Sequence, residues 1–257
     1  MRAEEHTLQL VREGYTIFAD AYDDDEVAFF RQAIVELYEG VGSPRCYSKD
    51  VVVLAPAVHV AQTGLILAKL VERRPDFAPR LLKPLVVDSI RAVLGADMYL
   101  ELTASVIADD TRVFFAWHTH IGGQDDRAFR ASGVWPEVPR ARRIGALLYL
   151  DDLTDENGPL LIYPRATGSP TRPPHDLEKV HWDGEVVARV RRGSVVAMDE
   201  CTWHAALEKT SPGLRILVGC NFVAADAPRA PLIEQSLASH PDAGELLRSV
   251  APPASAS

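Results

Sequence analysis

The stretch GSVVAMDECTWHAALEKTSPGLRILVGCNF, residues 193–222, contains two apolar runs, at 194–198 and 214–223, that are typical of buried strands. Glycine, proline and aspartate separate the runs, as expected for strands that are joined by turns. Another short strand between them leads to His204. This part of the chain therefore predicts closely spaced strands and no long helix.

Similar runs continue upstream of this stretch. MYLELTASVI at 98–107 alternates in polarity, and further strand-like runs lie at 112–118, 143–150, 159–163 and 185–190. Many short strands with turn residues between them indicate a β-sandwich or a jelly-roll barrel. The segments 122–140 and 168–176 carry no clear periodicity and are expected to be loops.

The first third of the chain is different and is expected to be mainly helical. Helices are predicted within residues 8–18, ending at Gly14, from Asp23 to Gly40, over roughly His59 to Arg74, and from Pro84 to Gly95. We therefore expect a single domain over residues 1–257. Residues 1–95 would support a β core at 96–225, and 226–257 would form a C-terminal helix and a disordered tail.

Composition limits the possible partners. The 257 residues are 47% hydrophobic and carry a formal net charge of −9, so no basic field attracts nucleic acid or anionic lipid. The three cysteines are widely spaced, which predicts neither a disulfide framework nor a cysteine zinc site. No apolar run is long enough to span a membrane. These features predict a cytoplasmic protein, and they leave the oligomeric state open.

Three histidines form a candidate metal site. His118 and His120 stand two residues apart in FFAWHTHIGG, so on a strand both imidazoles would project from one face. His204 lies far along the chain. Taken alone, this pattern leaves two interpretations open: a metal site, or buried histidines that hydrogen-bond to backbone groups.

Four blocks of the sequence resemble the phytanoyl-CoA dioxygenase family. They are REGYTIFADAYDDDEVAFFRQAI at 12–34, WHTH at 117–120, IGALLYLDDLTDENGPLLIYP at 144–164 and the stretch at 193–222 quoted above. The resemblance implies a mainly β fold, a double-stranded β-helix (a jelly-roll, cupin-like barrel) with helices packed outside. It also implies an oxygenase that uses iron(II), 2-oxoglutarate and dioxygen.

The resemblance assigns roles to particular residues. His118 matches the first iron ligand of the family, His204 matches the distal ligand, and Arg215 matches the arginine that binds the far carboxylate of 2-oxoglutarate. A planar guanidinium suits that task because it grips a carboxylate with two parallel hydrogen bonds.

One departure affects the metal site directly. The family has an aspartate where this chain has His120, so the expected ligands are the three histidines His118, His120 and His204. Two alternatives stay open: Asp125 or Asp126 folds back as the carboxylate ligand, or the site has lost or altered its iron. A second departure is Ala206, where the family often has a small polar residue.

Several other residues near the expected ligands have weaker assignments. Tyr149 alternates with apolar neighbours and is expected to face the barrel interior, where it could contact substrate. Arg165 and Thr167 follow a strand that should line the pocket and are candidates for orienting substrate. Trp117 and Trp203 each precede an expected ligand, so they should point away from the metal and pack in an outer core.

These residues support three functional hypotheses. The first is an iron(II)- and 2-oxoglutarate-dependent oxygenase, most simply a hydroxylase, that acts on a small or medium organic substrate such as a secondary metabolite; retention of Arg215 favours it. The second is a three-histidine iron enzyme that does not use 2-oxoglutarate, which His120 and Ala206 favour. The third is a non-catalytic ligand-binding barrel. A succinate assay would separate the first two.

Overall fold

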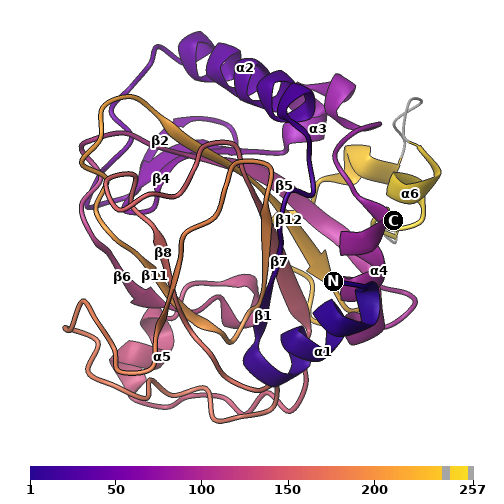
Figure 1. The fold of residues 1–257 in the computed structure, drawn as a ribbon, viewed down its shortest axis with the longest axis vertical. Coiled ribbons are helices and arrows are strands. Elements are labelled where there is room, and N and C mark those ends of the chain that lie inside the picture. Colours follow the sequence, from indigo (N-terminus) through magenta and orange to yellow (C-terminus); the bar gives the residue numbers. More distant parts are fainter. Residues whose placement is uncertain (239–243, 254–257) are drawn as a thin grey trace.

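The computed structural model describes residues 1–238 and 244–253 and contains two antiparallel sheets (Figure 1). The larger sheet has eight strands in the order β1-β10-β7-β12-β5-β4-β3-β2. They are β1 (Tyr15–Phe18), β2 (Val52–Ala55), β3 (Val58–Ala61), β4 (Gly64–Ala68), β5 (Tyr99–Ala108), β7 (Arg143–Tyr149), β10 (Val195–Asp199) and β12 (Arg215–Val223).

The smaller sheet has four strands in the order β6-β11-β8-β9. They are β6 (Phe115–His118), β8 (Leu160–Tyr163), β9 (Val186–Ala188) and β11 (Trp203–Ala206). Alternate residues of the two sheets form one interior cluster, in which Leu160 and Ile162 of β8 pack with Val196 and Leu217 of the larger sheet. The two sheets therefore enclose a barrel interior, and the strands predicted between residues 98 and 223 are confirmed.

All but one of the described helices cover the outer face of the larger sheet, and the exception, at residues 127–132, lies beside the smaller sheet (Figure 1). The helices are α1 (Ala3–Glu13), α2 (Asp24–Gly40), α3 (Leu70–Arg73), α4 (Pro84–Leu94), α5 (Arg127–Ser132) and α6 (Glu245–Arg248), with 3-10 turns at Pro75–Phe77, Ile121–Gly123 and Gln235–Ala238. Phe30 and Ile34 of α2 and Ile90 of α4 are fully buried in the cluster that contains Val218 and Phe222 of β12. Among the described residues, no helix is long and apolar enough to cross a membrane.

The helix predicted over His59 to Arg74 is wrong. That segment forms β3 and β4, and only its last residues form the one-turn helix α3. Gly64, with a φ of +142°, begins β4 directly after the turn. Because β4 pairs with β5, the apolar side chains of this segment pack in a sheet whose other strands lie elsewhere in the chain. The N-terminal third thus adds four strands, β1 to β4, to the larger sheet.

The other predicted helices are confirmed, with α1 beginning earlier than expected. The segment 122–140, expected to be a loop, contains the short helix α5. Residues 226–253 contain the 3-10 turn and α6, whereas the end of the predicted disordered tail, residues 254–257, lies outside the described residues.

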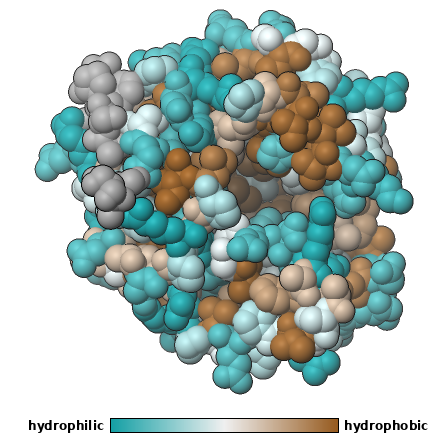
Figure 2. Space-filling view, turned by 180° about the vertical axis from the view of Figure 1, so that it is seen from behind, coloured by the Kyte–Doolittle hydropathy of each residue, from teal (hydrophilic) through white to brown (hydrophobic). Residues whose placement is uncertain are grey.

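The edge of the larger sheet exposes apolar side chains. Val52, Val53 and Leu54 of β2 are all exposed. Figure 2 shows hydrophobic residues gathered at the upper right, the side on which β2 lies when the view of Figure 1 is turned by 180°.

Gly14 joins α1 to β1 at a position where a side chain does not fit. Its φ is +75°, and an added Cβ would lie 2.4 Å from Thr202 Oγ1 and 2.8 Å from the carbonyl oxygen of Arg165. We expect Gly14→Ala to lower the free energy of unfolding by about 2–4 kcal/mol in denaturant titrations. Gly40→Ala is the matched control, because nothing lies within 4 Å of its Cβ position. Equal stability of the two variants would contradict this account.

Candidate metal centre

Strand pairing brings two of the three histidines together. His204 of β11 pairs directly with His118 of β6, and on its other side with Ile162 of β8, whose side chain lies in the barrel interior. Cross-strand partners project from the same face of a sheet, so both imidazoles point into the barrel. Both histidines are buried.

The third histidine comes from the segment that follows β6. His120 lies after the strand ends, at the start of the 3-10 turn, and its backbone N–H donates to the carbonyl of Glu200 at 2.9 Å. Its side chain keeps an exposed surface, unlike the other two histidines. His120 thus stands at the open edge of the cluster.

The three imidazoles are close enough to share one metal ion. One ring nitrogen from each of His118, His120 and His204 lies within 4.8 Å of those of the other two. The ring centroids are 4.1 Å apart for His118 and His204, 4.9 Å for His118 and His120, and 5.1 Å for His120 and His204. Within residues 1–238 and 244–253, no other group of three histidine, cysteine or acidic side chains meets this criterion.

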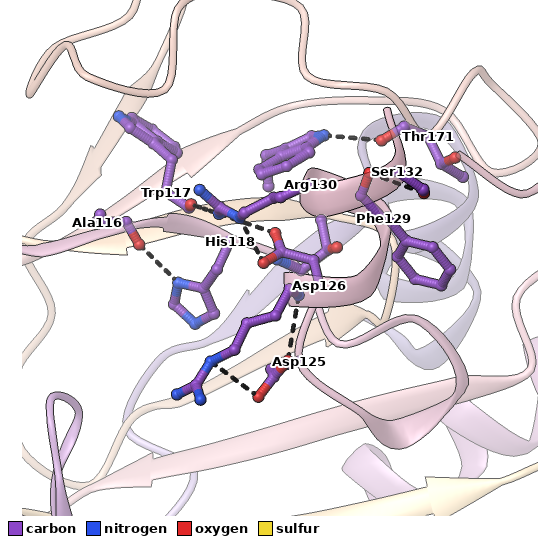
Figure 3. A network of polar contacts seen from close by, with 12 residues as sticks. Ala116, Trp117, His118, Asp125, Asp126, Phe129, Arg130, Ser132 and Thr171 are labelled. Carbon is purple, nitrogen blue, oxygen red and sulfur yellow. Dashed lines mark hydrogen bonds and ion pairs between the residues drawn. The ribbon is translucent and has the colours of Figure 1, made fainter. Parts of the chain in front are cut away.

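Backbone carbonyls orient the two buried rings. His118 Nδ1 lies 2.8 Å from the carbonyl oxygen of Ala116, and His204 Nδ1 lies 2.9 Å from that of Thr202 (Figure 3 shows the former). A carbonyl only accepts, so each Nδ1 must carry the proton, and each Nε2 is left with its lone pair free. This is the arrangement in which a histidine ligates metal through Nε2.

Burial also keeps these rings neutral. It holds the pKa of His118 well below its usual range and lowers that of His204 to about 3, and in each case a neighbouring histidine of the cluster adds to the effect. A metal ion needs the unprotonated ring. At neutral pH the two buried imidazoles are therefore in the form that binds metal.

The carboxylates considered as alternative ligands are engaged elsewhere. Asp126 is buried, accepts hydrogen bonds from Arg130 at 2.6 and 2.8 Å, and also accepts from the backbone N–H of Thr119 (Figure 3). Asp125 pairs with Arg127 at 3.4 Å. Neither carboxylate belongs to the imidazole cluster.

The tryptophans beside the histidines lie on the outer face of the smaller sheet, as expected. Trp117 and Trp203 are fully buried, and both pack with Trp182, which stacks on Trp117 at a centroid distance of 4.2 Å. Each indole N–H has a backbone acceptor, in Val180 and Thr171 respectively. These contacts make the back of the site rigid.

Arg215 is a buried cation. It begins β12, its Nη1 donates to the carbonyl of Gly158 at 2.5 Å, and its Nε has no hydrogen-bond partner among the described residues. None of the described carboxylates forms an ion pair with it, because Asp151, whose charge raises the pKa of Arg215, pairs with Arg31 at 2.9 Å. Burial has the larger effect and lowers the pKa of Arg215. A buried guanidinium normally requires an anion, so this position is suited to one.

Tyr149 lies in the barrel interior, in the cluster that contains Leu217, its cross-strand partner. Burial raises its pKa, and the charges of Arg215 and Arg112 act in the opposite direction. Its phenol is therefore close to Arg215. The expected interior position of Tyr149 is confirmed, whereas its contact with substrate stays a prediction.

Arg165 and Thr167 both lie beside Asp199. Thr167 donates to Asp199 at 3.4 Å, and Arg165 lies 4.0 Å from the same carboxylate. Arg165 also lines a pocket with Tyr163 and Trp203, whose side chains are on the outer face of the smaller sheet. A role of these two residues in substrate binding stays a prediction.

Sequence reasoning missed Arg112. It lies in the turn between β5 and β6, after Asp109, Asp110 and Thr111, and such a polar run normally indicates a solvent-exposed turn. In the structure its side chain is 1% exposed. No local signal distinguishes this arginine from a surface residue.

Comparisons with known proteins find several solved structures with a similar fold. The non-haem alpha-ketoglutarate-dependent carbocyclase SnoK from nogalamycin biosynthesis has a TM-score of 0.64 at 22% identity, over 93% of this chain and 92% of SnoK. EctD from S. alaskensis, with 2-oxoglutarate and 5-hydroxyectoine, has a TM-score of 0.63 at 20% identity, over 88% and 77%. HygX from Streptomyces hygroscopicus, with nickel and 2-oxoglutarate, has a TM-score of 0.59 at 15% identity, over 86% of each chain.

These similarities confirm the expected fold, a double-stranded β-helix with helices outside. A comparison with curated protein sequences finds no match. The model of the phytanoyl-CoA dioxygenase family, in contrast, matches residues 10–217. Because this match covers most of the chain, the protein belongs to the phytanoyl-CoA dioxygenase family of iron(II)- and 2-oxoglutarate-dependent oxygenases.

Proposed function

We propose that His118, His120 and His204 hold iron(II), that Arg215 anchors 2-oxoglutarate, and that the protein hydroxylates a small or medium organic substrate. The observation that carries the proposal is the convergence of three imidazoles within 4.8 Å inside the barrel. The reaction is R–H + O₂ + 2-oxoglutarate → R–OH + succinate + CO₂. One oxygen atom enters the product and the other enters succinate.

The donor set suits the metal. Imidazole is a good ligand for iron, and three facial ligands leave positions for a chelating co-substrate and oxygen. The metal supplies the coupling of dioxygen reduction to oxidation of the keto acid. The protein supplies fixed, neutral rings for His118 and His204, each oriented by a carbonyl two residues earlier.

Arg215 supplies the anchor for the keto acid. Its guanidinium is buried and has no carboxylate partner within the described part of the chain. A keto acid whose far carboxylate reaches Arg215 would satisfy that charge with paired hydrogen bonds. Tyr149 lies close by in the interior, so we include it among the residues that contact the bound molecules.

The third histidine changes the charge of the centre. With His120 in place of a carboxylate, the metal and its protein ligands carry one more positive charge, which strengthens the attraction for an anionic co-substrate. The same change weakens the electrostatic attraction between the protein ligands and the metal ion. We infer that this centre binds iron less tightly and the keto acid more tightly than a centre with a carboxylate ligand.

His120→Asp tests this inference. We expect the variant to bind iron(II) at least about 10-fold more tightly and 2-oxoglutarate at least about 10-fold more weakly, because a unit charge at such short range acts with more than 1.4 kcal/mol. Anaerobic equilibrium titrations measure both affinities. His181→Asp, which makes the same substitution at an exposed histidine outside the cluster, is the control. Unchanged affinities in His120→Asp would mean that His120 is not a ligand.

The partners of the proposed reaction are small molecules. The neighbours SnoK, EctD and HygX are described with alpha-ketoglutarate or 2-oxoglutarate, and HygX also with hygromycin B. We infer a small-molecule substrate and dioxygen, and no nucleic acid or membrane partner, given the net charge of −9. A cytoplasmic location is supported by three buried cysteines that are all free.

A second candidate function is favoured by one observation. Because His120 keeps an exposed surface, a chelating substrate could approach the metal directly, and iron chemistry would proceed without 2-oxoglutarate. This alternative predicts iron binding without succinate formation. The primary proposal predicts succinate in stoichiometric amounts with hydroxylated product.

A further inference from the structure

A second buried arginine faces the region of Arg215. Arg112 is 1% exposed, and its Nη2 donates to the carbonyl of Leu207 at 2.5 Å. Its Nε and Nη1 have no hydrogen-bond partner among the described residues, and none of the described carboxylates forms an ion pair with it. Desolvating such a cation without compensation costs several kcal/mol.

Both guanidinium groups lie against the backbone of Gly158. The carbonyl of Gly158 accepts the hydrogen bond from Arg215, and a Cβ added to Gly158 would lie 2.2 Å from Arg112 Nη2. The phenol of Tyr149 is close to both, since both charges act on its pKa. Arg112 and Arg215 therefore both lie against Gly158, and each has at least one guanidinium nitrogen without a hydrogen-bond partner among the described residues.

Two like charges so close together oppose each other. Burial, followed by the charge of Arg215, lowers the pKa of Arg112 to about 9, so the Arg112 guanidinium is still protonated at neutral pH. One carboxylate has about four lone-pair sites and can accept hydrogen bonds from two guanidinium groups at once. An anion bound there would relieve both the repulsion and the unsatisfied hydrogen-bond donors.

We propose that Arg112 is a second anchor for the co-substrate, and that Arg112 and Arg215 together bind the far carboxylate of 2-oxoglutarate. This inference rests on the proposed function. It makes Arg112 a specificity residue, because a 2-oxo acid that lacks the far carboxylate gains nothing from either arginine. The co-substrate requirement should therefore be strict.

The test uses Arg112→Gln, which keeps an N–H donor for the Leu207 carbonyl but removes the charge. Anaerobic iron-loaded protein is titrated with 2-oxoglutarate and with 2-oxopentanoate, which has a methyl group in place of the far carboxylate. We expect 2-oxoglutarate affinity to fall about 10- to 100-fold and 2-oxopentanoate affinity to stay within about twofold of wild type. Arg189→Gln, at an exposed arginine, is the control.

A second variant and a second measurement complete the test. Arg112→Lys retains the positive charge but not the paired N–H donors of the guanidinium, so it should recover part of the affinity for 2-oxoglutarate. The same variant replaces Arg112→Gln if Arg112→Gln does not fold. In metal-free protein, glutarate should raise the melting temperature of wild type more than that of Arg112→Gln at the same concentration. Equal weakening of both 2-oxo acids, or no weakening of either, would overturn the role of Arg112 while leaving the proposed function intact. Failure of wild type to bind 2-oxoglutarate would overturn both.

Discussion

His204→Ala is expected to abolish stoichiometric iron(II) binding, raising the dissociation constant at least about 100-fold. His204 lies in the centre of the smaller sheet, pairs with His118 across the strands, and is oriented by the Thr202 carbonyl. Removing it leaves one buried and one exposed imidazole, and two monodentate ligands hold iron poorly. Loss of outer-sphere partners alone typically costs 10- to 100-fold in metal affinity, so loss of a ligand should cost at least the upper end of that range.

Metal analysis after anaerobic loading and desalting measures this effect. His118→Ala should behave in the same way, because its ring is equally buried and neutral. His181→Ala removes an exposed histidine that pairs with Glu185, and it should retain one iron per chain. If His204→Ala kept its iron while folded, the metal would have to be held by other residues.

Arg215→Met is expected to lower the affinity for 2-oxoglutarate at least about 100-fold while leaving iron binding within a few fold. Methionine fills similar apolar volume but cannot neutralise a carboxylate inside the barrel, and removing one partner of a buried ion pair costs about 3–5 kcal/mol. Iron binding is retained because Arg215 donates to the carbonyl of Gly158 and is not one of the three residues of the imidazole cluster.

Equilibrium titration of iron-loaded protein with 2-oxoglutarate measures the loss. Arg189→Met is the matched control, since Arg189 is exposed and pairs with Asp155. Parallel loss of iron in Arg215→Met would point to a folding defect. Unchanged 2-oxoglutarate affinity with normal iron content would remove Arg215 from the proposed site.

The residues that lie on regular strands could be predicted from the sequence. His118 and His204 occur in short apolar runs within blocks that resemble a known family, and the pairing of β6 with β11 brings them together as expected. Arg215 starts an apolar strand, so its interior position follows from alternation with Ile216. In these cases local pattern and tertiary structure agree.

The predictions from sequence fail where contacts with distant parts of the chain determine the local structure. Residues 59–74 have apolar side chains compatible with a helix, but pairing of β4 with β5 makes a hairpin more favourable. Arg112 follows two aspartates and looks solvated, yet Leu207 and Gly158, which come from distant turns, enclose it. Burial of this kind depends on contacts within the folded barrel, so the residues next to Arg112 in the sequence do not indicate it.

The most direct test of the central claim is anaerobic addition of 2-oxoglutarate to wild-type protein loaded with iron(II). We expect one iron per chain and a weak visible charge-transfer band that saturates as the keto acid chelates the metal. Iron binding without such a band would contradict the role of 2-oxoglutarate and favour a three-histidine enzyme that does not use it. No iron binding at all would contradict the metal centre itself and leave a non-catalytic barrel.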